Sequence, residues 1–285
     1  MKARAYYNEI NPYAAQWLRN LILAGVIADG DVDERSIEDV KPYELTGYTQ
    51  CHFFAGIGVW SYALRQAGWA DNRRVWTGSC PCQPFSAAGK GDGVDDERHL
   101  WPAWQWLIQQ CQPDVIFGEQ VKSAIQHSWL DLVQSDLEGL GYTVAPFVLP
   151  ACGFGAPHIR ERLFFVADSK PWQLEGRESQ LLCRLGDTLS EGLEGHTWDV
   201  CDWNQSGRFD EKTGRPTAPP GLLGGFWKSA GWLPFTDGKV RPVEPGTPPL
   251  AYGTPSDMEL LQAYGNGIVA PVASAFIKSF MEVAV

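Results

Sequence analysis

The stretch from Val75 to Lys90 reads Val-Trp-Thr-Gly-Ser-Cys-Pro-Cys-Gln-Pro-Phe-Ser-Ala-Ala-Gly-Lys. Its apolar run stops abruptly at Ser79, which predicts a strand that leaves a sheet into a loop. Pro81 and Pro84 stiffen this loop, because proline fixes the backbone angle φ. Cys82 lies between them, so we expect a thiol with a fixed, exposed position, which suits a nucleophile better than a packing residue.

A metal site and a structural loop are the alternatives for this stretch. Cys80 and Cys82 form a C-x-C pair, but the sequence holds no second such pair and no His pair at zinc-ligand spacing. We therefore expect no metal. A loop with an inert cysteine is the simplest interpretation of the stretch alone, and the other motifs of the chain decide against it.

The segment from Pro81 to Ser86 resembles the Pro-Cys-Gln loop of the DNA cytosine-5 methyltransferases. Four further stretches resemble motifs of the same family, each at a predicted strand end. They are Phe53-Phe54-Ala55-Gly56-Ile57-Gly58 (its cofactor loop), Gly118-Glu119-Gln120-Val121 (its Glu-Asn-Val motif), Arg160-Glu161-Arg162 (its Arg-x-Arg motif) and Gly265-Asn266-Gly267-Ile268 (its last motif). Any one of these matches alone is weak, but five together indicate this family.

The fold class follows from the strand, glycine turn and helix pattern around Gly56-x-Gly58, which is typical of doubly wound α/β sheets. The resemblance implies a Rossmann-like, class I S-adenosylmethionine-dependent methyltransferase with a mostly parallel sheet and a small inserted target-recognition lobe. We expect a catalytic and cofactor-binding domain at 1–168 and a target-recognition region at 169–250, where glycine, proline and polar residues dominate. Residues 251–285 would return to the catalytic domain with the last motif and a helix.

The order of the motifs departs from that of the family. Between Gly58 and Cys82 there is room for one helix and one strand, whereas the family has two strand-helix units there, which carry the acidic residues for the ribose and adenine. Asn8-Glu9-Ile10 resembles the family's second motif and Gly30-Asp31-Val32 its third, and both lie earlier in the chain. We therefore infer a circular permutation in which the chain starts at the second strand of the sheet.

The resemblance also implies the chemistry: transfer of a methyl group from S-adenosylmethionine to carbon 5 of a flipped-out cytosine in double-stranded DNA. Cys82 would add to carbon 6 as a thiolate, and Glu119 would protonate ring N3. Arg162, with Arg160, would hold the pyrimidine O2 and a nearby phosphate.

The same resemblance implies a set of cofactor contacts. They comprise Phe53 beside the adenine, the turn at Ala55, Gly56, Ile57 and Gly58 around the methionine part, Glu9 on the ribose hydroxyls, Ile10 on the adenine face, Asp31 with Val32 at the adenine amino group, and also Pro81 and Asn266.

Composition bounds the class of protein. The chain has 285 residues and seven cysteines without regular spacing, which fits free thiols in a reducing compartment. We expect no signal peptide and no membrane segment, and a monomer in the cytoplasm of a bacterial host, of phage or prophage type. The net charge of -11 argues against a nucleic-acid partner, although the charge of a whole chain does not describe that of a cleft.

Two other functions stay open from the sequence. The same motif set occurs in enzymes that methylate tRNA, so RNA is an alternative substrate. A non-catalytic DNA-binding relative is the third hypothesis, suggested by Gln120 in place of the family's asparagine and by the small recognition region. The presence of Cys82, Glu119 and Arg162 favours an enzyme.

Overall fold

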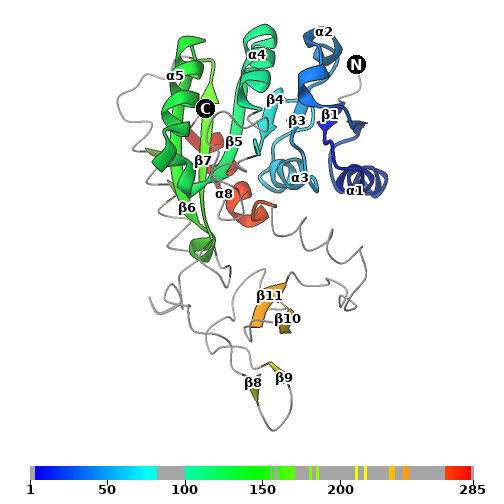
Figure 1. Cartoon of the computed structure of the whole chain (residues 1–285), viewed down its shortest axis with the longest axis vertical. Helices are drawn as coiled ribbons and strands as arrows, with labels where there is room; N and C mark the ends of the chain where they lie inside the picture. Colours follow the sequence, from blue (N-terminus) through cyan, green and yellow to red (C-terminus); the bar gives the residue numbers. More distant parts are fainter. Residues whose placement is uncertain are drawn as a thin grey trace.

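A computed structural model shows how the chain folds (Figure 1). It describes residues 4–81, 100–154, 156, 160–170, 180–181, 184–185, 209–210, 215–216, 231–234, 240–243 and 267–283. Within them, none of the helices combines the length and the apolar character that crossing a bilayer requires.

The elements follow one another in an alternating α/β order. They are β1 (Ala5–Asn8), α1 (Pro12–Leu23), β2 (Gly30–Asp33), η1 (Ile37–Asp39), α2 (Pro42–Leu45), β3 (Gln50–Phe53), α3 (Val59–Gln66), β4 (Val75–Gly78), α4 (Trp101–Cys111), β5 (Val115–Val121), η4 (Lys122–His127), α5 (Trp129–Gly139), β6 (Thr143–Pro150), η5 (Ala151–Phe154), β7 (Glu161–Asp168), β8 (Phe209–Asp210), β9 (Arg215–Pro216), β10 (Gly231–Pro234), β11 (Val240–Val243) and α8 (Ala270–Val283).

The main sheet has seven strands in the order β2-β1-β3-β4-β5-β7-β6. The pairs from β2 to β5 are parallel, and β7 is antiparallel to both of its neighbours. The prediction of a doubly wound, mostly parallel sheet is therefore confirmed. Two separate two-stranded sheets, β8-β9 and β10-β11, come from the region predicted to recognise the target.

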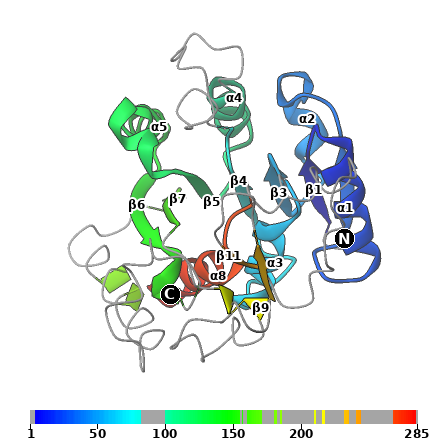
Figure 2. The same ribbon diagram turned by 60° about the horizontal axis from the view of Figure 1, so that its bottom comes forward.

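Helices cover both faces of the main sheet (Figure 2). On one face, α3 and α8 bury aromatic side chains such as Trp60 and Phe276 against Phe117 of β5, and α1 packs beside α3. On the other face, η1, α2, α4 and α5 share a second apolar cluster, in which Trp104 contacts Phe53. Because both faces are covered, the inner parallel strands β1, β3, β4 and β5 are buried almost throughout, as in other parallel sheets.

The N-terminal strand lies inside the sheet, as predicted. β1 pairs in parallel with β3 in the register Asn8↔Phe53 and with β2 in the register Asn8↔Asp33. The inferred circular permutation is wrong, however. A permutation that starts at β1 would move the glycine-turn strand β3 to the end of the chain, but β3 follows β2 and leads directly into β4. The unit β1-α1-β2 simply precedes β3.

This chain order requires one crossover connection of the uncommon, left-handed kind. The helices α1 and α3 lie on the same face, yet β1-α1-β2 runs toward the β2 edge and β3-α3-β4 runs away from it. Their crossovers must therefore have opposite hands. β4-α4-β5 runs away from the β2 edge on the other face, so it shares the hand of β1-α1-β2. Since about 98% of such crossovers are right-handed, β3-α3-β4 is the left-handed one.

Candidate active site

The carboxyl ends of β1, β3, β4 and β5 meet at one edge of the sheet, where ligands bind in folds of this type. After β3 the chain makes a tight turn in which Phe54, Gly56 and Gly58 all have positive φ angles, of 51°, 54° and 82°. A Cβ added at Gly56 would meet no atom of the described residues within 4 Å, so the turn borders open space. This is the glycine turn that the sequence predicted.

Glu9 follows β1 and faces this turn. Its Oε2 accepts a hydrogen bond from the backbone N–H of Gly56 at 2.7 Å, and its Oε1 accepts one from the backbone N–H of Asn11 at 2.9 Å. A carboxylate offers about four lone-pair sites, so two remain available on a side chain that is already oriented. This arrangement fits the predicted contact with a pair of ribose hydroxyls.

Ile10, the next residue, is 65% exposed. A large aliphatic side chain exposed at the carboxyl edge of a buried sheet is well placed to cover the face of a flat ring. Its placement fits the predicted contact with the adenine face.

The structure contradicts the prediction for Phe53. This side chain is 0% exposed and packs against Trp76 and Trp104 in the core, so it cannot lie beside a ligand. Phe54, one residue farther on, is partly exposed, leaves the strand with a positive φ and meets Trp104 edge to face. Phe54 is therefore the aromatic candidate for the cofactor edge.

The predictions for Asp31 and Val32 are also contradicted. Asp31 pairs with Tyr6 in the first half of β2, and its carboxylate binds Arg4 at 2.6 Å and the Tyr48 hydroxyl at 2.7 Å. Val32 packs into the apolar cluster around α1. Neither reaches the carboxyl edge, because β2 continues to Asp33.

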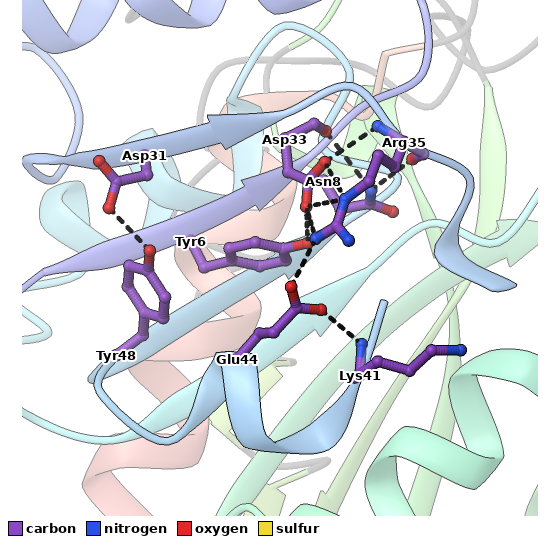
Figure 3. Close-up of polar contacts among 8 residues, drawn as sticks. All are labelled: Tyr6, Asn8, Asp31, Asp33, Arg35, Lys41, Glu44 and Tyr48. Carbon is purple, nitrogen blue, oxygen red and sulfur yellow. Dashed lines mark hydrogen bonds and ion pairs between the residues drawn. The ribbon is translucent and has the colours of Figure 1, made fainter. Parts of the chain in front are cut away.

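Asp33 and Arg35 occupy the edge instead (Figure 3). The Asp33 carboxylate accepts from the Tyr6 hydroxyl at 2.7 Å and from the Arg35 guanidinium, with 2.7 Å from Nη2 to Oδ2. Burial opposes ionisation, but Arg35 and Tyr6 outweigh it and hold the pKa of Asp33 below its usual range. Asn8 donates to the Arg35 carbonyl at 2.8 Å, so the chain after β2 is fastened beside Glu9.

A second cluster surrounds Glu119 near the end of β5. Its side chain is 6% exposed, and Arg162 of β7 places Nε 3.0 Å from its Oε1. Burial raises the pKa of the Glu119 carboxyl, and Arg162, the Ser79 hydroxyl and Arg160 offset only part of this rise. The structure thus brings Glu119 and Arg162 together as predicted, and it gives Glu119 the raised pKa that a general acid needs.

Arg160 serves a different contact from the predicted one. It precedes β7 with a φ of 31°, and its Nη2 donates to the carbonyl of Gly267, ahead of α8, at 2.7 Å. Burial and the neighbouring charge of Arg162 lower the pKa of Arg160 to about 10. This arginine therefore ties the C-terminal segment to the Glu119 cluster.

Gln120 anchors the loop that leads to Cys82. Its Nε2 donates to the carbonyl of Cys80 at 3.1 Å, and its Oε1 accepts from the N–H of Val121 at 2.9 Å. The longer side chain thus makes a buried contact to the loop even though the family has asparagine here. Pro81 is the last described residue of this loop, and Cys82 and Asn266 lie outside the described residues.

Sequence reasoning missed Ser79 and Trp60. The indole Nε1 of Trp60 donates to Ser79 Oγ at 3.1 Å. Gly78 pairs with Gly118, so the Ser79 hydroxyl lies next to the Glu119 carboxyl, whose pKa it lowers. These contacts join residues 19 and 40 positions apart, so no local pattern signals them. The sequence signal that could have pointed to Ser79 is its position at the end of the apolar run that starts at Val75.

Known proteins are similar to parts of this chain. Residues 72–181 match the model of the C-5 cytosine-specific DNA methylase family. Type II methyltransferase M.AluI of Cellulosimicrobium cellulans is 34% identical over 60% of this chain and 33% of its own length. Type II methyltransferase M.HhaI of Haemophilus parahaemolyticus is 26% identical over 82% of this chain and 94% of its own. A solved Spodoptera frugiperda DNMT2 mutant aligns with a TM-score of 0.38 and 15% identity, covering 61% of this chain and 53% of that one.

The match does not extend over the whole of every relative. The chain spans 29%, 33% and 24% of the length of the first three curated relatives that it matches. The matched segment of 72–181 holds the Cys82 loop, Glu119, Arg160 and Arg162. It leaves out Glu9 and the glycine turn, which the structure places together at the carboxyl ends of β1 and β3.

Proposed function

We propose, from the premise that residues 72–181 belong to the C-5 cytosine-specific DNA methylase family, that the chain methylates carbon 5 of cytosine in double-stranded DNA. S-adenosylmethionine is the cofactor that this family implies. The observation that carries the proposal is the buried Glu119 carboxyl, with its raised pKa, next to Arg162 and to the loop that leads to Cys82.

Each residue of this cluster has a defined part. Carbon 5 of cytosine is a poor nucleophile. Addition of the Cys82 thiolate to carbon 6 makes carbon 5 electron-rich. Glu119, whose pKa is raised by burial, donates its proton to ring N3 as the thiolate adds. Arg162 stabilises the charge that develops on O2. The base is flipped out of the duplex, because none of these groups can reach it inside a stack.

The cofactor supplies the methyl group, and residues at the edge of β1 and β3 would hold it. Glu9 would accept from the ribose hydroxyls, Ile10 would cover the adenine and the turn at Gly56 would surround the methionine part. Phe54 would take the role predicted for Phe53 beside the adenine. Asp33 and the backbone after it would take the role predicted for Asp31 and Val32 at the adenine amino group. Because the cofactor carries no phosphate, the glycine turn serves close approach and not anion binding.

The unit β1-α1-β2 stands in for the two strand-helix units that the family has after the glycine turn. The left-handed crossover supports this. On the face that α3 occupies, a connection from β3 to β1 would be right-handed, whereas the connection to β4 is left-handed. The helix position thus fits an ancestral order in which β3 preceded β1. Residues 169–250 serve as the target-recognition region, in which β8-β9 and β10-β11 form sheets of their own.

The substrate is tested by supplying radiolabelled S-adenosylmethionine with purified DNA or purified tRNA. The proposal predicts label in DNA that bisulfite treatment leaves as unconverted cytosine. Label in tRNA alone would assign the protein to the RNA-modifying enzymes, and cofactor-independent DNA binding without label would favour the non-catalytic relative.

Removal of the Glu9 carboxylate should weaken cofactor binding. Glu9→Ala leaves the ribose hydroxyls without an acceptor in a partly buried site, which costs about 1 to 3 kcal/mol and lowers affinity roughly 10- to 100-fold. Titration of S-adenosylhomocysteine by calorimetry measures this. Asp31→Ala is the matched control, since Asp31 binds Arg4 and Tyr48 away from the edge, and its affinity should equal that of the wild type. Equal affinity of Glu9→Ala and the wild type would show that the cofactor is held elsewhere.

A further inference from the structure

Ser79 is the first residue after β4, and its hydroxyl lies between two partners. The indole Nε1 of Trp60 can only donate, so Ser79 Oγ is the acceptor of that 3.1 Å hydrogen bond. A hydroxyl has a single hydrogen, which is then free to point to the Glu119 carboxylate, because Gly78 pairs with Gly118 and Ser79 and Glu119 follow them at the ends of neighbouring strands. We propose that Ser79, oriented by Trp60, is a positioning residue that aims the Glu119 carboxyl at the target base and sets the pH range in which it works. This inference rests on the proposed function.

Trp60 is held rigidly enough to orient the hydroxyl. Its side chain is 3% exposed, stacks on Phe117 with ring centroids 6.1 Å apart, and meets the edge of Phe164 at 6.0 Å. It lies in the first turn of α3, directly after the glycine turn. The hydrogen-bond chain from Trp60 through Ser79 to Glu119 therefore links the cofactor edge to the predicted acid.

The groups that face Glu119 come from two further strands besides its own. Arg162 and Arg160 approach from β7 and the residue before it, and Ser79 approaches from the end of β4. Both arginine side chains are guanidinium groups, which carry a positive charge in proteins. Ser79 differs from them because its contribution is a hydrogen bond that can be removed without changing the charge of the site.

The sign of the expected pH effect follows from this geometry. A hydroxyl that donates to a carboxylate favours its ionised form and lowers its pKa. Without Ser79, the Glu119 carboxyl keeps its proton to higher pH. Because the reaction needs the protonated acid, activity falls as pH rises through the pKa of Glu119, and loss of Ser79 must move this fall to higher pH.

The test compares profiles of kcat against pH for the wild type, Ser79→Ala and Ser79→Thr. For Ser79→Ala we expect the alkaline limb at higher pH, together with a plateau about 10-fold lower because the carboxyl is less well aimed. Ser79→Thr retains a hydroxyl and should restore both features. A limb that does not move in Ser79→Ala, or one that Ser79→Thr fails to restore, would overturn the proposal.

Two tryptophan variants test the orientation. Trp60→Phe keeps an aromatic ring but removes the N–H, so its alkaline limb should shift from that of the wild type. Trp69→Phe is the matched control, since Trp69 packs on the same Phe117 but donates to the Arg73 carbonyl, away from Glu119. Its limb should coincide with that of the wild type, and shifts of equal size in both variants would reduce Trp60 to a packing role and overturn this part of the proposal.

A readout without catalysis separates this inference from the proposed function. Titration of the Glu119 side-chain carboxyl carbon by ¹³C NMR, assigned with Glu119→Gln, reports its pKa directly. A higher pKa in Ser79→Ala supports the inference even if no methyl transfer to nucleic acid is found, in which case only the proposed function fails. An unchanged pKa contradicts the inference even in an active methyltransferase.

Discussion

Cys82→Ala is expected to abolish methyl transfer, with a loss of about 10⁴-fold or more, the scale seen when a nucleophile that forms a covalent intermediate is removed. Cys80→Ala should keep much of the activity, because the loop is anchored through the Cys80 backbone carbonyl, which the substitution retains. Incorporation of label from S-adenosylmethionine into DNA measures both variants.

The covalent step can be observed separately. DNA that contains 5-fluorocytosine should become trapped on the wild-type protein, because fluorine at carbon 5 prevents release of the cysteine adduct. Cys82→Ala should form no such complex. Trapping by the Cys82→Ala protein would mean that another residue is the nucleophile.

Glu119→Gln is expected to lower kcat by about 10²-fold or more, the usual loss when a general acid is removed. The amide cannot deliver a proton to N3, while its size preserves the packing beneath Arg162. Affinity for S-adenosylhomocysteine should stay unchanged, because Glu9 and the glycine turn form a separate cluster. Single-turnover rates and calorimetry measure the two effects.

Glu161→Gln provides the control for loss of a nearby acid. The Glu161 carboxylate forms an exposed ion pair with Lys122 at 2.7 Å and does not contact Glu119 in the described residues. Its rate should therefore match that of the wild type. Similar losses in both variants would indicate a general electrostatic effect and would leave Glu119 without a specific role.

Much of the fold could be predicted because strand ends carry strong local signals. The apolar run before Glu119 predicted a buried strand, and the pattern around Gly56 predicted a tight glycine turn after β3; both are confirmed. The position of β1 beside β3 could be predicted because the two strand-helix units that the family has after the glycine turn are missing from that part of the chain. The prediction of a circular permutation was wrong, because β1-α1-β2 lies directly before β3 and α3, and β3 is not at the end of the chain.

The errors at the cofactor edge have a common physical origin. Strands of four residues carry too few alternating positions to fix where they end, and β2 ends two residues later than its motif suggested. Two residues of strand span roughly 6.6 Å, enough to move Asp31 from the edge to a contact with Tyr48. A shift of one residue likewise separates Phe53 in the core from Phe54 at the edge, because β3 ends at Phe53 and Phe54 leaves the strand with a φ of 51°.

The polar contacts of Ser79 and Gln120 depend on the assembled fold. Gln120 reaches Cys80 and Ser79 reaches Glu119 only because β4 and β5 pair in the register Gly78↔Gly118. The sequence carries the residues of these contacts but not their pairing.

Bisulfite sequencing of DNA from cells that express the wild-type protein or Cys82→Ala at equal levels tests the central claim most directly. The account predicts unconverted cytosines at a recurring sequence in the wild-type sample and complete conversion in the Cys82→Ala sample. Complete conversion in both samples, with the wild-type protein folded and binding S-adenosylhomocysteine, would contradict the assignment of DNA cytosine methylation to this chain.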